Sequence, residues 1–276
     1  MWESRCSGIN DSVTLVHLSV KEYLLSSAIK GTEVRSFALS EEIGYQTLTT
    51  FCLSYLSAAE FRKGPAMTPE EWAHRDASHP FLDHASRAWP RYAILVGQPH
   101  DLVCKIIDFF KLESAGSFIS WVQVLNADIS WNKYPRGRNP LYYSASFGLD
   151  KVVSRLILEN PNPVSINAPA SRYGGTALHG AVLRQHPQVM KLLLDAGADA
   201  NKCDDNEVPP LHTAAIYGNF EIISLLLKAK ARGDKSVEGQ TPLGWVRTYG
   251  HRKAEDLLVR WEEDQKKQKW LGGSSS

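Results

Sequence analysis

Residues 174–201 read GGTALHGAVLRQHPQVMKLLLDAGADAN, and this stretch decides the fold. A threonine opens a short apolar run, a leucine-rich run follows, and a glycine ends the pattern. This order predicts two short antiparallel helices. Neither helix can bury both of its faces alone, so the unit is expected to stack on copies of itself.

The opening segment TALH at 176–179 recurs further along the chain. It returns as PPLH at 209–212 and TPLG at 241–244, and a fainter copy, NPLY, stands at 139–142. A period of 32–37 residues between copies is typical of a helical solenoid. A glycine follows seven residues after the leucine in three of the copies, where a left-handed turn would end the first helix. The second copy has Gln185 at that position, and we expect a differently built turn there.

Residues 174–201 resemble the ankyrin repeat nearly throughout. The resemblance implies an all-α fold in which a helical N-terminal domain precedes an α-solenoid of about four repeats. It places the repeats at 137–171, 172–204, 205–236 and 237–270. It also implies that His179 and His212 hydrogen-bond backbone groups of neighbouring repeats rather than bind a metal.

The first and last copies depart from this pattern. The first carries an insertion, NPNP at 160–163, whose prolines should end the preceding helix. The last ends in a polar helix, which suits a terminal capping repeat, and residues 271–276 are expected to form a flexible tail.

The first half of the chain is predicted to be helical. A capping box at 19–22 should start a helix after a short strand near Val13. Helical spacing returns at 48–56, 72–96 and 101–112, and Pro80 and Pro90 are expected to interrupt the second of these stretches.

The phrase VHLSVKEYL at 16–24 resembles a segment of fungal NACHT–ankyrin proteins, which are signal-transduction ATPases. In that family the segment ends a winged helix, and a helical linker then leads to ankyrin repeats. The resemblance implies a winged-helix remnant at 1–31 and a helical linker domain at 32–130. The sequence has no GxxxxGK[ST] phosphate-binding loop, so ATPase activity is not carried over. We expect either a shortened relative or the C-terminal portion of a longer one.

The composition excludes several classes of function. Lys and Arg number 31 against 30 Asp and Glu, which argues against an electrostatically driven nucleic-acid binder. No apolar run is long enough to span a bilayer, and the four cysteines match no zinc spacing. We therefore expect a soluble, cytoplasmic protein without a cofactor, and a nuclear location stays open.

Chemistry-bearing residues are densest around His74, His79 and His84, with Asp83 beside them. Their spacing fits no familiar zinc pattern, so surface histidines are the favoured interpretation. The alternative is an unfamiliar enzyme or biosynthetic accessory site between the helical domain and the repeats. No nucleophile elbow or other catalytic motif supports it, and we expect a non-catalytic adaptor.

The partner-binding surface is expected on the concave side of the repeats, as in ankyrin proteins generally. Phe147, Arg184, Tyr217 and Tyr249 occupy one repeat position and should form a stripe, because aromatic residues and arginine dominate binding hot spots. For Phe147 and Tyr249, packing against neighbouring helices is the alternative. The hairpin tips add further candidates: Arg136, Arg138, Arg172, Tyr173, Asp205, Asn206 and Glu238.

Overall fold

The computed structural model describes residues 41–111, 115–127, 130–135, 139–160, 162–234 and 236–272. The predicted winged-helix remnant at 1–31 and the candidates Arg136 and Arg138 lie outside the described residues, as does most of the predicted tail.

Six helices of the first half and nine of the second are described, and the predicted all-α class is confirmed. The first half contains α3 (Glu41–Leu56), α4 (Ala59–Arg62), α5 (Pro69–Ser78), α6 (Leu82–Leu95), α7 (His100–Phe110) and α8 (Ala115–Asn126). The second half contains α9 (Pro140–Phe147), α10 (Asp150–Glu159), α11 (Pro163–Ile166), α12 (Ala177–Leu183), α13 (Pro187–Asp195), α14 (Pro210–Tyr217), α15 (Phe220–Lys228), α16 (Pro242–Thr248) and α17 (Arg252–Gly272). None of the described helices is both long and apolar enough to cross a bilayer.

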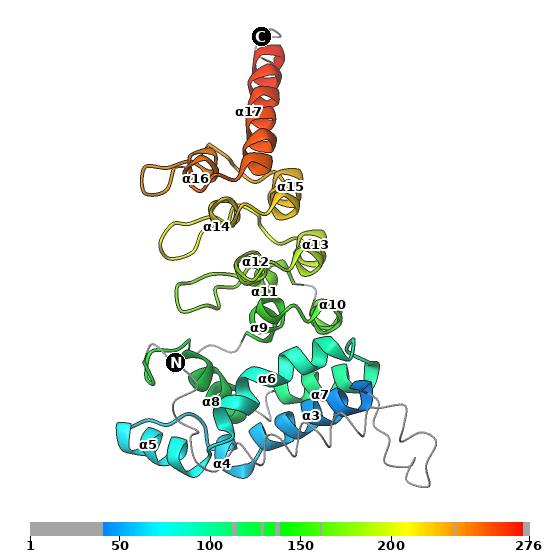
Figure 1. Cartoon of the computed structure of the whole chain (residues 1–276), viewed down its shortest axis with the longest axis vertical. Helices are drawn as coiled ribbons and strands as arrows, with labels where there is room; N and C mark the ends of the chain where they lie inside the picture. The colour runs from blue at the N-terminus through cyan, green and yellow to red at the C-terminus, as the bar shows by residue number, and fades with distance from the viewer. Residues whose placement is uncertain are drawn as a thin grey trace.

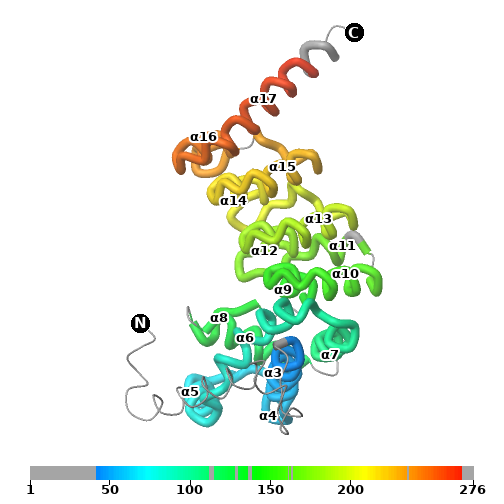
Figure 2. Tube along the Cα trace, turned by 45° about the vertical axis from the view of Figure 1, so that its right-hand side comes forward, coloured from blue at the N-terminus to red at the C-terminus, as the bar shows by residue number. Residues whose placement is uncertain are grey.

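The repeats form two rows of helices. Helices α9, α12, α14 and α16 follow one another in the first row, and α10, α13, α15 and α17 form the second row beside it (Figures 1 and 2). Helix α17 continues past the stack and projects from its end. The predicted caps are found, since Asn139 Oδ1 accepts from Tyr142 N at 2.9 Å and Thr241 Oγ1 from Gly244 N at 3.2 Å.

The turn between the two helices of each repeat is left-handed in every copy. Gly148 and Gly218 have φ of 74° and 66°, and Gln185 takes the same conformation with φ of 63°. The expectation of a differently built turn at Gln185 is therefore wrong. The fold imposes one turn geometry, and the glutamine side chain returns a hydrogen bond from Nε2 to Val182 O at 2.9 Å.

The insertion in the first repeat acts as predicted on the helix before it. Helix α10 ends at Glu159, directly ahead of the NPNP segment. The short helix α11 then supplies an extra turn that the other repeats lack and that the sequence pattern did not indicate.

The prediction that Pro90 interrupts a helix is wrong, because α6 runs through it. Proline lacks the N–H that would bond the carbonyl four residues earlier, which here belongs to Ser86. That buried carbonyl accepts instead from Trp121 Nε1 at 2.9 Å. The indole of α8 thus replaces the missing bond, and only the interruption predicted at Pro80 is found, between α5 and α6.

The helical region and the first repeat share one core. Tyr143 and Val152 of the repeat are buried together with Trp89 and Trp121 of the helical region. Polar contacts reinforce this junction, since the buried Gln98 donates from Nε2 to Asp150 Oδ1 at 2.7 Å. The solenoid is therefore built directly onto the helical region.

Candidate binding surface

The ends of the first-row helices form one edge of the solenoid with large exposed side chains. Leu183, Tyr217 and Tyr249 are 43%, 50% and 52% exposed, and Arg184 is exposed beside them. We call these four residues the aromatic ridge. They stand at the C-terminal ends of α12, α14 and α16. These helices follow one another in the first row (Figure 2).

Contacts within the last repeat hold one end of the aromatic ridge in place. The Tyr249 ring stacks between Trp245 and His251, with centroid distances of 5.9 and 6.1 Å. His251 is itself anchored, because its Nε2 lies 2.9 Å from Ile216 O in the repeat before. Tyr249 is therefore ordered and still half exposed, which lowers the entropy that binding would cost.

Phe147 does not join the ridge, although its sequence position predicted it. Its ring packs against Trp89 and Trp121, at centroid distances of 6.5 and 6.0 Å. For Phe147, the alternative prediction, packing against the N-terminal helices, is therefore the correct one. The shared core at the junction draws the ring inward.

The hairpin tips divide into a structural and an exposed group. Arg172 donates from Nη2 to the Lys133 and Asn126 carbonyls and so ties the first described tip to the segment after α8. Tyr173 is 54% exposed beside it. The other described candidates at the tips are exposed as predicted: Asp205, Asn206 and Glu238.

The hairpin tips of two neighbouring repeats, at Tyr173 and Asp205, are joined through their backbones. Asp205 N donates to Tyr173 O at 2.8 Å. Gly174 has φ of 70°, and a side chain there would collide with the Asp205 carboxylate. The tips at Tyr173 and Asp205 are therefore linked to each other rather than standing as separate loops.

The ankyrin-type histidine at 179 has the structural role that the sequence predicts. His179 Nδ1 accepts from Thr176 N at 3.1 Å, and its Nε2 lies 3.2 Å from Val208 O in the next repeat. Burial lowers its pKa, since the charged form loses its hydration. His212 occupies the same position one repeat later and is buried as well.

His74, His79 and His84 do not converge. His79 pairs with Glu60 at 2.9 Å, His84 Nε2 lies 3.2 Å from the Tyr92 hydroxyl, and His74 is exposed on α5. Asp83 pairs with Arg87 instead of facing any of them. Across the described residues, no group of three His, Cys, Asp or Glu side chains could hold a metal ion. An enzyme site built from this cluster would need these side chains to meet at one place, but each contacts a different partner.

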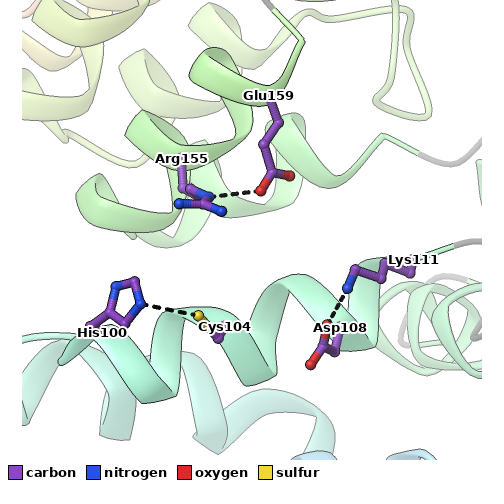
Figure 3. A network of polar contacts seen from close by, with 6 residues as sticks. All are labelled: His100, Cys104, Asp108, Lys111, Arg155 and Glu159. Atoms are coloured by element: carbon purple, nitrogen blue, oxygen red, sulfur yellow. Dashed lines mark hydrogen bonds and ion pairs between the residues drawn. The ribbon is translucent and has the colours of Figure 1, made fainter.

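A second pair with possible chemistry lies on α7 and is drawn in Figure 3. Cys104 Sγ is 3.6 Å from His100 Nε2, which resembles a nucleophile beside a base. A working pair also needs a group that orients the imidazole. The carboxylate one turn further on, Asp108, pairs with Lys111 instead. On the neighbouring helix α10, Glu159 pairs with Arg155. Among the residues drawn, none therefore serves as that orienting group.

The repeat pattern did not indicate one exposed aromatic residue of the solenoid, Phe220. Phe220 opens α15 and is 50% exposed, immediately after the turn that carries Tyr217. The corresponding residues of the other repeats are Asp150, Pro187 and Arg252. An aromatic residue at an otherwise polar or proline position was the available signal.

The comparisons with known proteins agree with this architecture. A family model described as ankyrin repeats (3 copies) matches residues 101–204 and 188–269. The first match begins within the helical region, at the start of α7.

Several relatives share parts of the chain. "Azaphilone pigments biosynthesis cluster protein L" of Monascus ruber is 24% identical over 198 residues, covering 67% of this chain and 41% of its own length. Mouse inversin is 33% identical over 121 residues, and "protein phosphatase 1 regulatory subunit 12A" of rat is 37% identical over 101 residues. These two matches cover 43% and 37% of this chain and 11% and 9% of the relatives. The chain thus spans less than half the length of each of these relatives.

Proposed function

Since the chain belongs to the ankyrin-repeat family, we propose that it is a non-catalytic adaptor that captures a protein partner on the concave side of its repeats. The aromatic ridge is the observation that carries this proposal. Its side chains are large, exposed and aligned across three successive repeats. A folded protein has little reason to expose such a row unless another surface covers it.

The exposed tip residues would extend the same surface. Tyr173, Asp205, Asn206 and Glu238 stand on the hairpins of the repeats that carry the ridge. Arg172 and Phe147 are left out of the proposed contact surface, because each is already engaged within the chain.

The ridge is tested by removing its three polar-tipped members together. In the variant Arg184→Ala/Tyr217→Ala/Tyr249→Ala we expect an unchanged circular dichroism spectrum and loss of the partners that the wild-type chain captures by crosslinking in extracts of the source organism. The matched control is Met67→Ala/Leu158→Ala/Val164→Ala, whose side chains are 62%, 78% and 77% exposed elsewhere. Identical capture by the wild type and the ridge variant would reject the proposal.

We further infer that the helical region connects the repeats to a signalling ATPase module of the NACHT type. The support is the segment at 16–24 together with the shared core, which makes the helical region a rigid base for the solenoid. Mapping of transcripts upstream of the Met1 codon tests this inference. A reading frame that encodes no nucleotide-binding loop there, and no such protein among the captured partners, would contradict it.

A role as an accessory protein in a biosynthetic cluster is the second candidate. It is favoured by the Monascus relative, whose match of 198 residues is longer than the predicted repeat region at 137–270 and so extends into the helical region. Neighbouring genes that encode biosynthetic enzymes, with expression in step with this one, would distinguish this setting from a signalling one.

A further inference from the structure

A cavity of about 670 Å³ lies at the C-terminal end of the solenoid, between the end of α15 and α17. The end of α15 and the loop after it form one wall, and the second half of α17 forms the other. Lys230, Arg232 and Asp234 line the first wall, and Trp261, Glu262 and Lys266 line the second. Cavities of this size commonly accept small ligands or short peptide segments.

Asparagines hold the equivalent loops of the earlier repeats. Asn167 accepts from Asp199 N at 2.7 Å and donates to Gly197 O at 3.2 Å in the next loop. Asn201 repeats both bonds one unit later, to Arg232 N at 2.8 Å and Lys230 O at 3.1 Å. Each asparagine therefore grips the extended backbone of the loop that follows it.

Asp234 stands where the next asparagine of this series would be. It follows Lys230 by four residues, as Asn201 follows Gly197. The loop that it would hold should come after α17, but that helix has 21 residues where α13 and α15 have 9 each. Among the described residues no backbone group is hydrogen-bonded to the Asp234 side chain, and Asp234 lines the cavity.

The cavity presents cations that have no ion-pair partner among the described residues. Lys230, Arg232 and Lys266 all line it, and the described lining residues include two carboxylates, Asp234 and Glu262. Lys230 also has φ of 61°, in the left-handed position that Gly197 fills one repeat earlier. A lysine there accepts backbone strain that glycine would avoid, and strain of this kind concentrates at functional positions.

An indole forms the apolar side of the same cavity. Trp261 lies against Gly233, and a Cβ at residue 233 would stand 2.5 Å from Trp261 Cζ3. The equivalent residue of the preceding repeat is Ala200. The glycine thus lets the indole rest directly on the loop backbone, which fixes both walls.

We propose that this cavity binds an extended acidic peptide of a partner protein, in the place of the missing loop. The peptide backbone would donate N–H groups to Asp234, as the loops of earlier repeats do to Asn167 and Asn201. Its acidic side chains would pair with Lys230, Arg232 and Lys266, and an apolar side chain between them would cover Trp261. This site is separate from the aromatic ridge and goes beyond the proposed function.

The test uses the full chain and a fluorescein-labelled peptide with the core Asp-Leu-Asp. We expect saturable binding by fluorescence anisotropy that weakens with added salt, since ion pairs at a half-open site are screened. The substitutions Arg232→Glu and Lys266→Glu should each weaken binding at least tenfold. An Asn-Leu-Asn peptide should bind as weakly as the acidic peptide binds these variants.

The matched control is Lys228→Glu, which reverses an exposed cation at the end of α15 that does not line the cavity. Its affinity should equal that of the wild type, as should that of the ridge variant. In the wild type, the peptide should also shift the indole resonance of Trp261 in NMR spectra, which needs no variant to fold. The proposal would be overturned if the acidic peptide showed no saturable binding or left the Trp261 resonance unshifted. It would also be overturned if Lys228→Glu lost as much peptide affinity as Arg232→Glu and Lys266→Glu.

Discussion

The helical region centres its core on Trp89 and Trp121, whereas the repeats bury small residues such as Ala181 and Ala214 between aliphatic side chains. Small residues let neighbouring repeats approach closely, and each interface contacts only the next one. The aromatic core instead gathers helices from widely separated parts of the sequence around two indoles. Damage should therefore spread through the helical region and the first repeat, and stay local in the later repeats.

The largest effect is expected for Trp121→Ala. This indole is fully buried, packs on Trp89, Phe109 and Tyr143, and bonds the carbonyl that Pro90 leaves free. Its loss should lower the free energy of unfolding by about 3–5 kcal/mol, since a large cavity and an orphaned carbonyl result. Urea titration followed by far-ultraviolet circular dichroism measures this.

Trp245→Ala is the control for Trp121→Ala in the repeats. Trp245 is only partly buried at the last repeat, so its loss should cost clearly less. Hydrogen exchange should show that Trp121→Ala loosens α9 and that Trp245→Ala does not. Equal losses in the two variants would contradict the contrast between the cores.

Glycines in the repeat turns should separate strain from collision. Gly218 and Gly250 share a left-handed φ, of 66° and 72°. A methyl group at Gly218 would collide with the His251 imidazole, whereas at Gly250 it would meet open space. Gly250→Ala should cost about 1 kcal/mol from backbone strain alone, and Gly218→Ala about 2–3 kcal/mol because overpacking is added.

Thermal unfolding of both variants measures the difference. The double variant Gly218→Ala/His251→Ala is the control, because removal of the imidazole should return the extra cost of the Gly218 substitution. A double variant that loses as much stability as the sum of the two single changes, or more, would show that the collision is not the cause.

Acid should weaken the repeats through the buried histidines. Burial lowers the pKa of His179 below its ordinary value of about 6.5, and that of the half-buried His186 as well. The unfolded chain then binds more protons than the folded chain below pH 6.5, so stability is full above that pH and falls as the pH decreases. Near pH 5.5 the loss should be about 1 kcal/mol for His179, within the limit of 1.4 kcal/mol per pH unit.

His179→Asn should reduce this pH dependence, since an amide oxygen can still accept from Thr176 N but takes up no proton. His74→Asn is the control, because His74 is exposed and should leave the pH profile unchanged. A profile that is the same in all three proteins, from urea titrations between pH 7.5 and 5.5, would refute a role for His179.

The repeats could be predicted from the sequence because their interactions recur at a fixed interval. Caps, prolines and leucines each recur at the same repeat positions, so Thr176 and Leu178 predict the same helical unit as Thr241 and Leu243. Pro90 shows where such reasoning stops. Its tolerance within α6 depends on Trp121, which lies 31 residues away and carries no local signal.

The candidate surface was predictable in part for the same reason. Position in the repeat correctly indicated exposure at Arg184, Tyr217 and Tyr249. It failed to indicate that Phe147 packs against Trp89 and Trp121, because the first repeat has neighbouring helices that the repeat pattern does not describe. Asp234 likewise gains its meaning only from the length of α17, which continues where the earlier helices turn.

The smallest effect is expected at Gln185, because among the described turns between the two helices of a repeat it stands where the others have glycine. Gln185 holds φ of 63° at a cost that glycine avoids, but its side chain bonds Val182 O. Gln185→Gly should raise the free energy of unfolding by about 0.5 kcal/mol, since relief of strain exceeds the loss of one partly exposed hydrogen bond. Gln185→Ala should lower it, because alanine keeps the strain and loses the bond. Gly148 and Gly218 each face a histidine of the next repeat, His186 and His251. For residue 185 the residue at the same repeat position is Asn219, so no imidazole needs space there and a glutamine can persist. If Gln185→Gly destabilised the chain, the side-chain bond would outweigh the backbone strain, and the turns would be equivalent in energy as well as in shape.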